Sequence, residues 1–63
     1  MAIDYKEIIV DGFLKLNEKQ TIEDITIKQI LETSKVSRQT FYNHFLDKND
    51  LLQYIYETRI NPY

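Results

Sequence analysis

Side chains that can bind a nucleic acid are concentrated in one short stretch of the sequence, TSKVSRQTFYNHFL at residues 33–46. This stretch contains Lys35, Arg38 and His44 and no Asp or Glu, although the 63-residue chain has a formal charge of −2. Arginine can bind guanine with two hydrogen bonds, Gln and Asn can bind adenine in the same way, and cations attract phosphate. The residue types in this stretch are therefore suited to contacts with base edges and with the phosphate backbone.

The charge is distributed unevenly along the chain. Residues 1–24 contain six acidic residues and three lysines, whereas residues 33–46 contain one lysine, one arginine and no acid. The net charge alone argues weakly against nucleic-acid binding, because such proteins usually have an excess of Lys and Arg. A polarised distribution can nevertheless give one surface that selects polyanions.

The composition indicates one small helical domain over residues 1–63. A single Gly and a single Pro leave few positions for the backbone angles that hairpins need, so we expect an all-α fold. The absence of Cys excludes disulfides and thiolate zinc sites. No apolar run approaches the roughly 20 residues of a membrane span, and the first residues carry acids where a secretory signal would be basic. We therefore expect a soluble, cytoplasmic protein with no membrane partner.

A first helix is predicted over residues 5–19, with Asp4 as its N-cap. Apolar residues recur there at spacings of three and four, which places them in one stripe on a helix. The stripe consists of Ile8, Ile9, Gly12, Phe13 and Leu16. Because Gly12 costs about 1 kcal/mol relative to Ala in a helix, we expect it to allow another helix to approach closely.

Two short helices are predicted next, after a connection at residues 20–25. Thr26 and Gln29 have the spacing of a capping box, which indicates a helix over residues 27–33. Ser37 is the N-cap of a third helix over residues 38–45. A fourth helix follows, capped by Asp47, and is expected to continue until Asn61 and Pro62.

The two middle helices, about four residues apart, form a helix-turn-helix unit, whose second helix can lie in the major groove of DNA. Val36, Phe41 and Phe45 are expected to face the core. The polar residues of the third helix are then left outside, with Tyr42 at the boundary. They are Arg38, Gln39, Thr40, Asn43 and His44.

Residues 25–57 resemble the DNA-binding domain of the TetR family of transcriptional regulators. The resemblance lies in Thr26, Val36-Ser37, Thr40-Phe41-Tyr42, His44-Phe45, Lys48 and Leu51-Leu52. It implies a three-helix bundle with a helix-turn-helix in helices 2 and 3, and a fourth, connecting helix. It also implies sequence-specific binding to double-stranded DNA.

The resemblance implies a role for each matching residue. Thr26, Tyr42, His44 and Lys48 match family positions that contact the DNA backbone. Those that match positions at base edges or neighbouring phosphates are Arg38, Gln39, Thr40 and Asn43. Lys35 and Ser37, in the turn and at the start of the third helix, complete the expected DNA-binding set.

The sequence departs from the family pattern at two positions. The family usually has Gly in the turn where Lys35 stands, and often Gly where Gln20 ends the first helix. We expect both residues to accept a left-handed backbone at modest cost, and Lys35 could add a phosphate contact.

The resemblance also implies a larger protein than the 63 residues. A C-terminal domain, absent here, would form a homodimer on a palindromic operator and bind a small effector, and the regulator would be a repressor. The fourth helix, with Tyr54, Ile55 and Tyr56 beyond its core pair, would transmit the movement, so we expect some apolar surface on this helix to be uncovered.

Other functions have less support from the residues. A small helical module that binds a protein partner through the tyrosine-rich fourth helix is the alternative. An enzyme is not expected, because Ser37 has no base and acid to pair with it and the chain has no phosphate-binding glycine loop. His44, without Cys or a second His, does not indicate a metal site, and no cofactor is expected.

Overall fold

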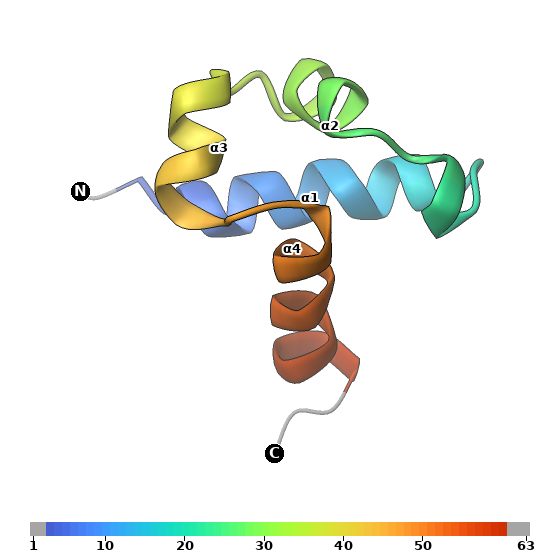
Figure 1. Cartoon of the computed structure of the whole chain (residues 1–63). Coiled ribbons are helices and arrows are strands. Elements are labelled where there is room, and N and C mark those ends of the chain that lie inside the picture. The colour runs from blue at the N-terminus through green and yellow to red at the C-terminus, as the bar shows by residue number, and fades with distance from the viewer. Residues whose placement is uncertain (1–2, 61–63) are drawn as a thin grey trace.

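The computed structural model describes residues 3–60, which form helices and helical turns without any strand. The elements, in chain order, are the helix α1 (Tyr5–Asn17), the 3₁₀ turn η1 (Ile22–Asp24), the helices α2 (Ile27–Ser34), α3 (Arg38–His44) and α4 (Lys48–Ile55), and the π-helical turn η2 (Tyr56–Ile60). Figure 1 shows α2 and α3 above α1, and α4 below α1 with its axis pointing downward. The predicted all-α fold, with a helix-turn-helix and a fourth helix, is confirmed.

All four α-helices begin where the sequence predicts, because each start has a capping side chain. Each cap accepts a hydrogen bond from the backbone N–H three residues further on. The caps and distances are Asp4 at 3.3 Å, Thr26 at 3.2 Å, Ser37 at 3.0 Å and Asp47 at 2.9 Å. The Gln29 side chain accepts the reciprocal bond from the Thr26 N–H at 3.0 Å, which completes the capping box.

The ends of the first three helices differ from the prediction by one or two residues, whereas α4 ends at Ile55 and the predicted continuation to residue 60 is π-helical. The first helix ends at Asn17 rather than residue 19, because the N–H groups of Lys19 and Gln20 both turn back to the Leu16 carbonyl. That arrangement reverses the chain without a left-handed residue. The expectation of a left-handed backbone at Gln20 is therefore wrong.

Lys35 does have the predicted left-handed backbone, with φ 61° and ψ 39°. It is the one residue other than Gly with positive φ in the described part of the chain. Its N–H donates to the Leu31 carbonyl at 2.8 Å, which closes α2 and starts the turn toward α3.

Gly12 lies where α1 passes closest to α2. A Cβ atom at this position would come within 2.9 Å of the Ser34 Cβ, which is shorter than a normal van der Waals contact. The expected close approach of another helix is confirmed, and the helix concerned is the first of the helix-turn-helix. The position of α2 thus depends on a hydrogen atom in place of a side chain on α1.

One apolar core lies between the four helices. It consists of Ile9, Val10, Phe13, Ile25, Ile30, Phe41, Phe45, Leu51 and Ile55. Ile55 belongs to this core, since only 4% of the residue is exposed. Ile55 follows Leu51 by four residues and so shares the inner face of α4. Tyr56 is 55% exposed, as expected, and Tyr54 is half-buried.

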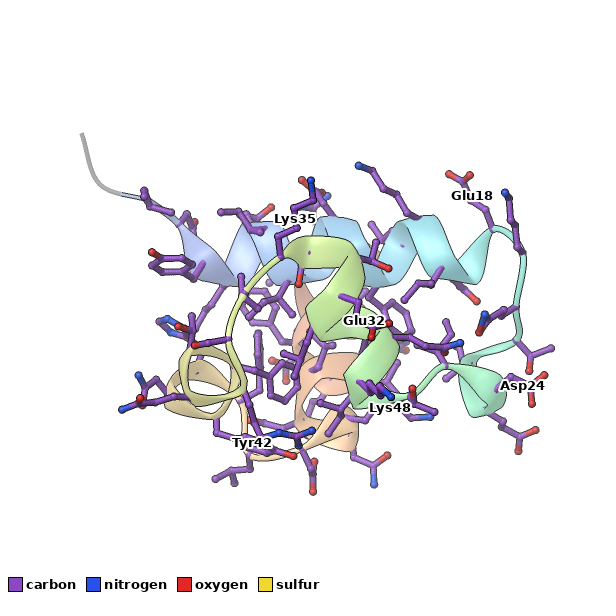
Figure 2. All side chains as sticks on the ribbon, turned by 90° about the horizontal axis from the view of Figure 1, so that it is seen from above. Glu18, Asp24, Glu32, Lys35, Tyr42 and Lys48 are labelled. Atoms are coloured by element: carbon purple, nitrogen blue, oxygen red, sulfur yellow. The ribbon has the colours of Figure 1, made fainter. Side chains whose placement is uncertain are left out.

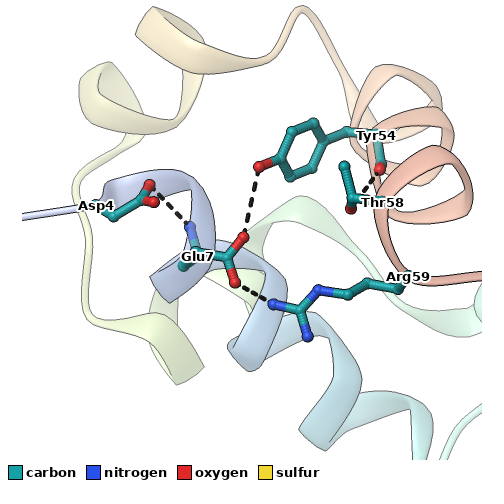
Figure 3. Close-up of polar contacts among 5 residues, drawn as sticks. All are labelled: Asp4, Glu7, Tyr54, Thr58 and Arg59. Carbon is teal, nitrogen blue, oxygen red and sulfur yellow. Dashed lines mark hydrogen bonds and ion pairs between the residues drawn. The ribbon is translucent and has the colours of Figure 1, made fainter. Parts of the chain in front are cut away.

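Polar side chains connect α4 and η2 to the start of α1 (Figure 3). The Tyr54 hydroxyl donates to a Glu7 carboxylate oxygen at 3.4 Å, and Arg59 forms an ion pair with the other oxygen of Glu7. The Lys6 ammonium lies 5.2 Å from the centre of the Tyr54 ring. Burial, and then the carboxylates of Glu7 and Asp4, raise the pKa of the Tyr54 phenol. The predicted stop at Asn61 and Pro62 lies outside the described residues.

Candidate nucleic-acid interface

The two faces of α3 are separated as the sequence predicts. Phe41 and Phe45 are 0% and 3% exposed and pack together in the core, with ring centres 5.7 Å apart. We call the opposite side the outer face of α3; its residues are Arg38, Gln39, Thr40, Tyr42, Asn43 and His44. All of these are exposed except Thr40, which is half-buried. Arg38, Gln39 and Asn43 have no side-chain hydrogen bond to the described residues, so their donors are free for another molecule.

Two hydroxyl groups pair at the start of α3. Ser37 Oγ accepts from the Thr40 N–H at 3.0 Å and donates to Thr40 Oγ1 at 2.9 Å. Because a hydroxyl has one proton and two lone pairs, this pairing leaves the proton of the Thr40 hydroxyl for a further acceptor. Ser37 has no group within the site that could activate it, and its place in the structure is that of a cap.

The aromatic residues of the outer face rest on neighbouring rings. Tyr42 meets Phe41 edge to face at 5.2 Å and remains 42% exposed. His44 stacks on Tyr5, the first residue of α1, with ring centres 6.1 Å apart. Tyr5 was not expected at this surface, since 39 positions separate it from His44 and no local pattern links the two. Its contact extends the outer face of α3 onto α1.

The turn between α2 and α3 presents Lys35 to solvent, while Val36 packs partly against the core. Thr26 is exposed at the other end of α2. The helix-turn-helix thus has an exposed candidate contact residue in the turn, at the start of α2 and along α3.

Lys48 differs from the other candidate residues, because its ammonium group already has partners inside the molecule. Its Nζ donates to the carbonyl oxygens of Ile22 at 2.9 Å and Ile25 at 2.8 Å. The first carbonyl belongs to the 3₁₀ turn before α2 and the second to the residue directly after that turn, and Lys48 reaches both from the start of α4 (Figure 2). The structure therefore brings Lys48 next to the start of α2 rather than to the outer face of α3.

The helix α3 carries no acidic residue, and the nearest acids after it in the sequence are bound to backbone N–H groups. Glu18 and Asp24 lie at the end of the molecule opposite α3 (Figure 2). Close to the end of α3, the carboxylates of Asp47 and Asp50 accept hydrogen bonds from the N–H groups of Asp50 and Leu46, both at 2.9 Å. A polyanion approaching α3 from outside would therefore meet donors and cations, without a free carboxylate on the helix itself.

A hollow of about 250 Å³ lies between the start of α1, the end of α3 and α4. Its lining mixes the basic residues Lys6 and His44 with the acids Asp50 and Glu57. Within residues 3–60, no group of three His, Cys, Asp or Glu side chains could hold a metal ion. This hollow shares only His44 with the outer face of α3 and has no consistent charge for a phosphate.

The arrangement of α2 and α3 and the free donors on α3 define a class of protein, the helix-turn-helix DNA-binding regulators. Comparison of the sequence with known families makes the assignment specific. The model of the family "Bacterial regulatory proteins, tetR family" matches residues 9–55. The chain belongs to the TetR family, and these residues are its DNA-binding domain.

Individual relatives are regulators of the helix-turn-helix type. The DhaS protein of Lactococcus lactis, a transcriptional activator of the dhaKLM operon, is 36% identical over 56 residues, which cover 89% of this chain and 30% of DhaS. The regulator YxbF of Bacillus subtilis is 43% identical over 49 residues, 76% of this chain and 13% of YxbF. The regulator SAB2452 of Staphylococcus aureus is 29% identical over 62 residues, 98% of this chain and 34% of that protein.

The chain thus spans about a third or less of the length of these relatives. No solved structure matches it. None of the helices in residues 3–60 is long and apolar enough to cross a membrane.

Proposed function

We propose that this chain binds double-stranded DNA sequence-specifically, with α3 in the major groove and α2 across the phosphate backbone. In this proposal the side chains of Arg38, Gln39, Thr40 and Asn43 reach base edges or the nearest phosphates. Arginine offers two parallel donors to guanine, and the amides of Gln and Asn offer a donor and an acceptor to adenine. The Thr40 methyl group can contact that of thymine.

The observation that carries the proposal is the division of α3 into two faces. Both phenylalanines are in the core, and the donors of Arg38, Gln39 and Asn43 have no partner among the described residues. A helix used only for packing would not need a row of free donors without acids between them. A helix that enters a groove benefits from both properties, because base edges and phosphates accept hydrogen bonds and the phosphates repel carboxylates.

Contacts with the phosphate backbone are proposed for residues around this helix. Thr26 at the start of α2, Lys35 in the turn, Ser37, Tyr42 and His44 form this group. Support comes from their exposure and from the absence of acids in the first turns of α2 and α3. Lys48 was expected in the same group, but two of the three N–H groups of its ammonium are occupied, which leaves at most one for a phosphate.

The role of the whole protein is also part of the proposal. We infer that residues 1–63 are the reading head of a longer cytoplasmic regulator whose C-terminal domain forms a homodimer and binds an effector. Two heads would then bind the two halves of a palindromic operator. Repression is the expected direction of control, although DhaS, of similar sequence, is an activator.

Selection from a random pool of duplex DNA, followed by chemical-shift mapping on the selected duplex, tests the proposal. A single head should bind weakly, close to the nonspecific range of about 10⁻⁴ to 10⁻⁶ M. Shifts concentrated at residues 35–45 and at Thr26 are expected. Binding without such shifts, or shifts confined to Tyr54 and Tyr56, would favour the alternative of a module that binds a protein through α4.

A further inference from the structure

We infer that Lys48 acts on DNA binding from inside the molecule, as a positioning residue that holds the two ends of the helix-turn-helix together. We call the Lys48 ammonium and the carbonyl oxygens of Ile22 and Ile25 the Lys48 clamp. The distances, 2.9 and 2.8 Å, are those of good charge-assisted hydrogen bonds. Within residues 3–60, no other side chain donates to a carbonyl more than four positions away.

The clamp closes a loop that contains the whole helix-turn-helix. Lys48 is the first residue of α4, directly after the link from α3, and Ile25 is the second residue before α2. Lys48 lies 23 positions after Ile25, and the residues between them include α2, the turn and α3. Without the clamp, only core packing and the turn at Lys35 would hold the start of α2 in position relative to the end of α3.

The clamp acts next to a residue of the proposed interface. Ile25 is fully buried, and its neighbour Thr26 caps α2 through the capping box. Fixing the Ile25 carbonyl therefore fixes the position of the Thr26 side chain relative to α3 and α4. A displaced α2 would move Thr26 away from the phosphate that it is proposed to contact, while α3 lies in the groove.

The chemistry of the site suits an ammonium group. The carbonyls of Ile22 and Ile25 lie at the two ends of a 3₁₀ turn, and the Ile25 N–H bonds back to the Ile22 carbonyl at a long 3.3 Å. Carbonyl groups that point out of such a turn attract a cation, as at a helix C-terminus. Lysine has a compact charge with three donors that can turn toward two converging acceptors, whereas arginine has a planar fork.

This inference rests on the proposed function in one respect, that α2 and α3 together face DNA. It assigns a different cause to the effect of Lys48, however. A phosphate contact would release counterions when DNA binds, and its loss would reduce the slope of log K against log salt by about 0.9. Loss of an internal clamp weakens DNA binding because α2 and Thr26 are displaced, and it leaves the slope of log K against log salt unchanged.

The first test compares Lys48→Met with Lys15→Met, which removes the same charge from an exposed lysine on α1. We expect Lys48→Met to lower Tm by about 4–8 °C, and Lys15→Met to change it little. Binding to a mixed-sequence duplex, titrated between about 50 and 200 mM salt, should be weaker for Lys48→Met with an unchanged slope. Equal Tm values for the two variants, or a slope reduced by about 0.9, would overturn the inference.

The second test needs no substitution and remains valid if Lys48→Met does not fold. In nitrogen-15 spectra of the unmodified chain, the Lys48 ammonium should exchange slowly with water and show cross-peaks to Ile22 and Ile25. These cross-peaks should persist when the mixed-sequence duplex is added, and their loss on DNA binding would contradict the clamp. If the unmodified chain binds no duplex, the proposed function fails, but the spectrum of the free chain still decides whether the clamp exists.

Discussion

The two lysines that flank α3 in the sequence, Lys35 and Lys48, differ in how their charges are used. Lys35 stands in the turn with an exposed side chain and a left-handed backbone. Lys48 has an ordinary helical backbone, and its ammonium is bound to two carbonyls. The resemblance to the TetR family implies a contact with the DNA backbone for Lys48, and Lys35, where the family usually has Gly, is expected to add a phosphate contact. The difference teaches that the role of a cation depends on the acceptors within its reach, and the acceptors of Lys48 are 23 and 26 positions away.

The same contrast between free and internally bound groups divides the rest of the molecule. The outer face of α3 has donors without partners, whereas the inner face, the Lys48 clamp and the Glu7–Tyr54–Arg59 contacts are satisfied within the chain. Substitutions in the first group should change DNA binding and leave stability alone. Substitutions in the second group should change stability first.

Phe41→Ala should have the largest effect and marks one extreme of the comparison. Phe41 is completely buried, and removal of such a ring costs about 3–5 kcal/mol. A domain of this size has a total stability of the same order, so the variant should be mostly unfolded at 25 °C by circular dichroism. Gln39→Ala, on the same helix but exposed, is the control and should melt within a few degrees of the unmodified chain. A folded, cooperative Phe41→Ala variant would show that α3 does not depend on this core contact.

Arg38→Ala marks the other extreme. Its exposed side chain has no described partner, so the free energy of unfolding should change by no more than about 0.5 kcal/mol. Loss of a two-bond contact with guanine should cost about 1–3 kcal/mol at the base pairs concerned. Competition between the selected duplex and single-base variants measures this loss of preference, and Arg38→Lys, which keeps the charge, separates base reading from phosphate attraction. A uniform loss across all duplexes would assign Arg38 to the backbone instead.

The local features of the fold were predictable from the sequence, and the features that depend on distant contacts were not. The four caps follow from residue types within three or four positions of one another, and the left-handed Lys35 follows from the resemblance to a family that usually has Gly in this turn. The burial of Phe41 and Phe45 follows from helical spacing. Residues in irregular segments, such as Ile25 after the 3₁₀ turn, have no period from which burial could be inferred.

The candidate site shows the same limit. The exposed positions of α3 followed from the inward direction of the two phenylalanines, and the sequence placed them correctly. The stacking of His44 on Tyr5 and the partners of Lys48 require the packing of α1 and η1 against the helix-turn-helix. The apolar Ile25 in the short connection before α2 was a sequence feature that pointed to an internal partner for Lys48. If this connection is buried, its carbonyl groups need hydrogen-bond donors, and a lysine can supply them.

Lys35→Gly should sharpen the comparison of the two lysines, with a smaller effect. The left-handed backbone costs a residue other than Gly about 1–2 kcal/mol, and Gly avoids this cost while it loses about 0.4–1 kcal/mol through a more flexible unfolded chain. We therefore expect a gain in stability of up to about 1 kcal/mol by urea denaturation. If Lys35 contacts a phosphate, the slope of log K against log salt should fall by about 0.9 in Lys35→Gly. The slope for Lys48→Met, in contrast, is expected to stay unchanged.

Lys35→Asn is the matched variant, because Asn also lacks the charge and accepts the left-handed region more readily than Lys. Both variants should have the same salt slope, and stability should decrease in the order Gly, Asn, Lys. A Lys35→Gly variant less stable than the unmodified chain would contradict the left-handed turn.

The smallest expected effect concerns the contacts between α1 and α4, where the half-buried phenol of Tyr54 has an internal partner. Burial and the carboxylates of Glu7 and Asp4 raise the pKa of Tyr54 in the folded chain, whereas a phenol in the unfolded chain ionises near pH 10. The folded state therefore holds this proton more tightly, and the resulting stability is complete below about pH 10 and is lost as the pH rises through the folded pKa. Tyr54→Phe lacks this dependence.

At neutral pH, Tyr54→Phe should be less stable by no more than about 1 kcal/mol, the value of one hydrogen bond at a partly exposed site. Above about pH 10 the difference between the two proteins should shrink, because only the unmodified chain has the phenol to lose. Urea denaturation at pH values on both sides of this ionisation measures the difference, with Tyr56→Phe as the control at a phenol that is 55% exposed and has no hydrogen bond within the described residues. A difference that stays constant with pH would mean that the Tyr54 hydroxyl does not interact with Glu7, and that α4 is attached to α1 by its apolar face alone.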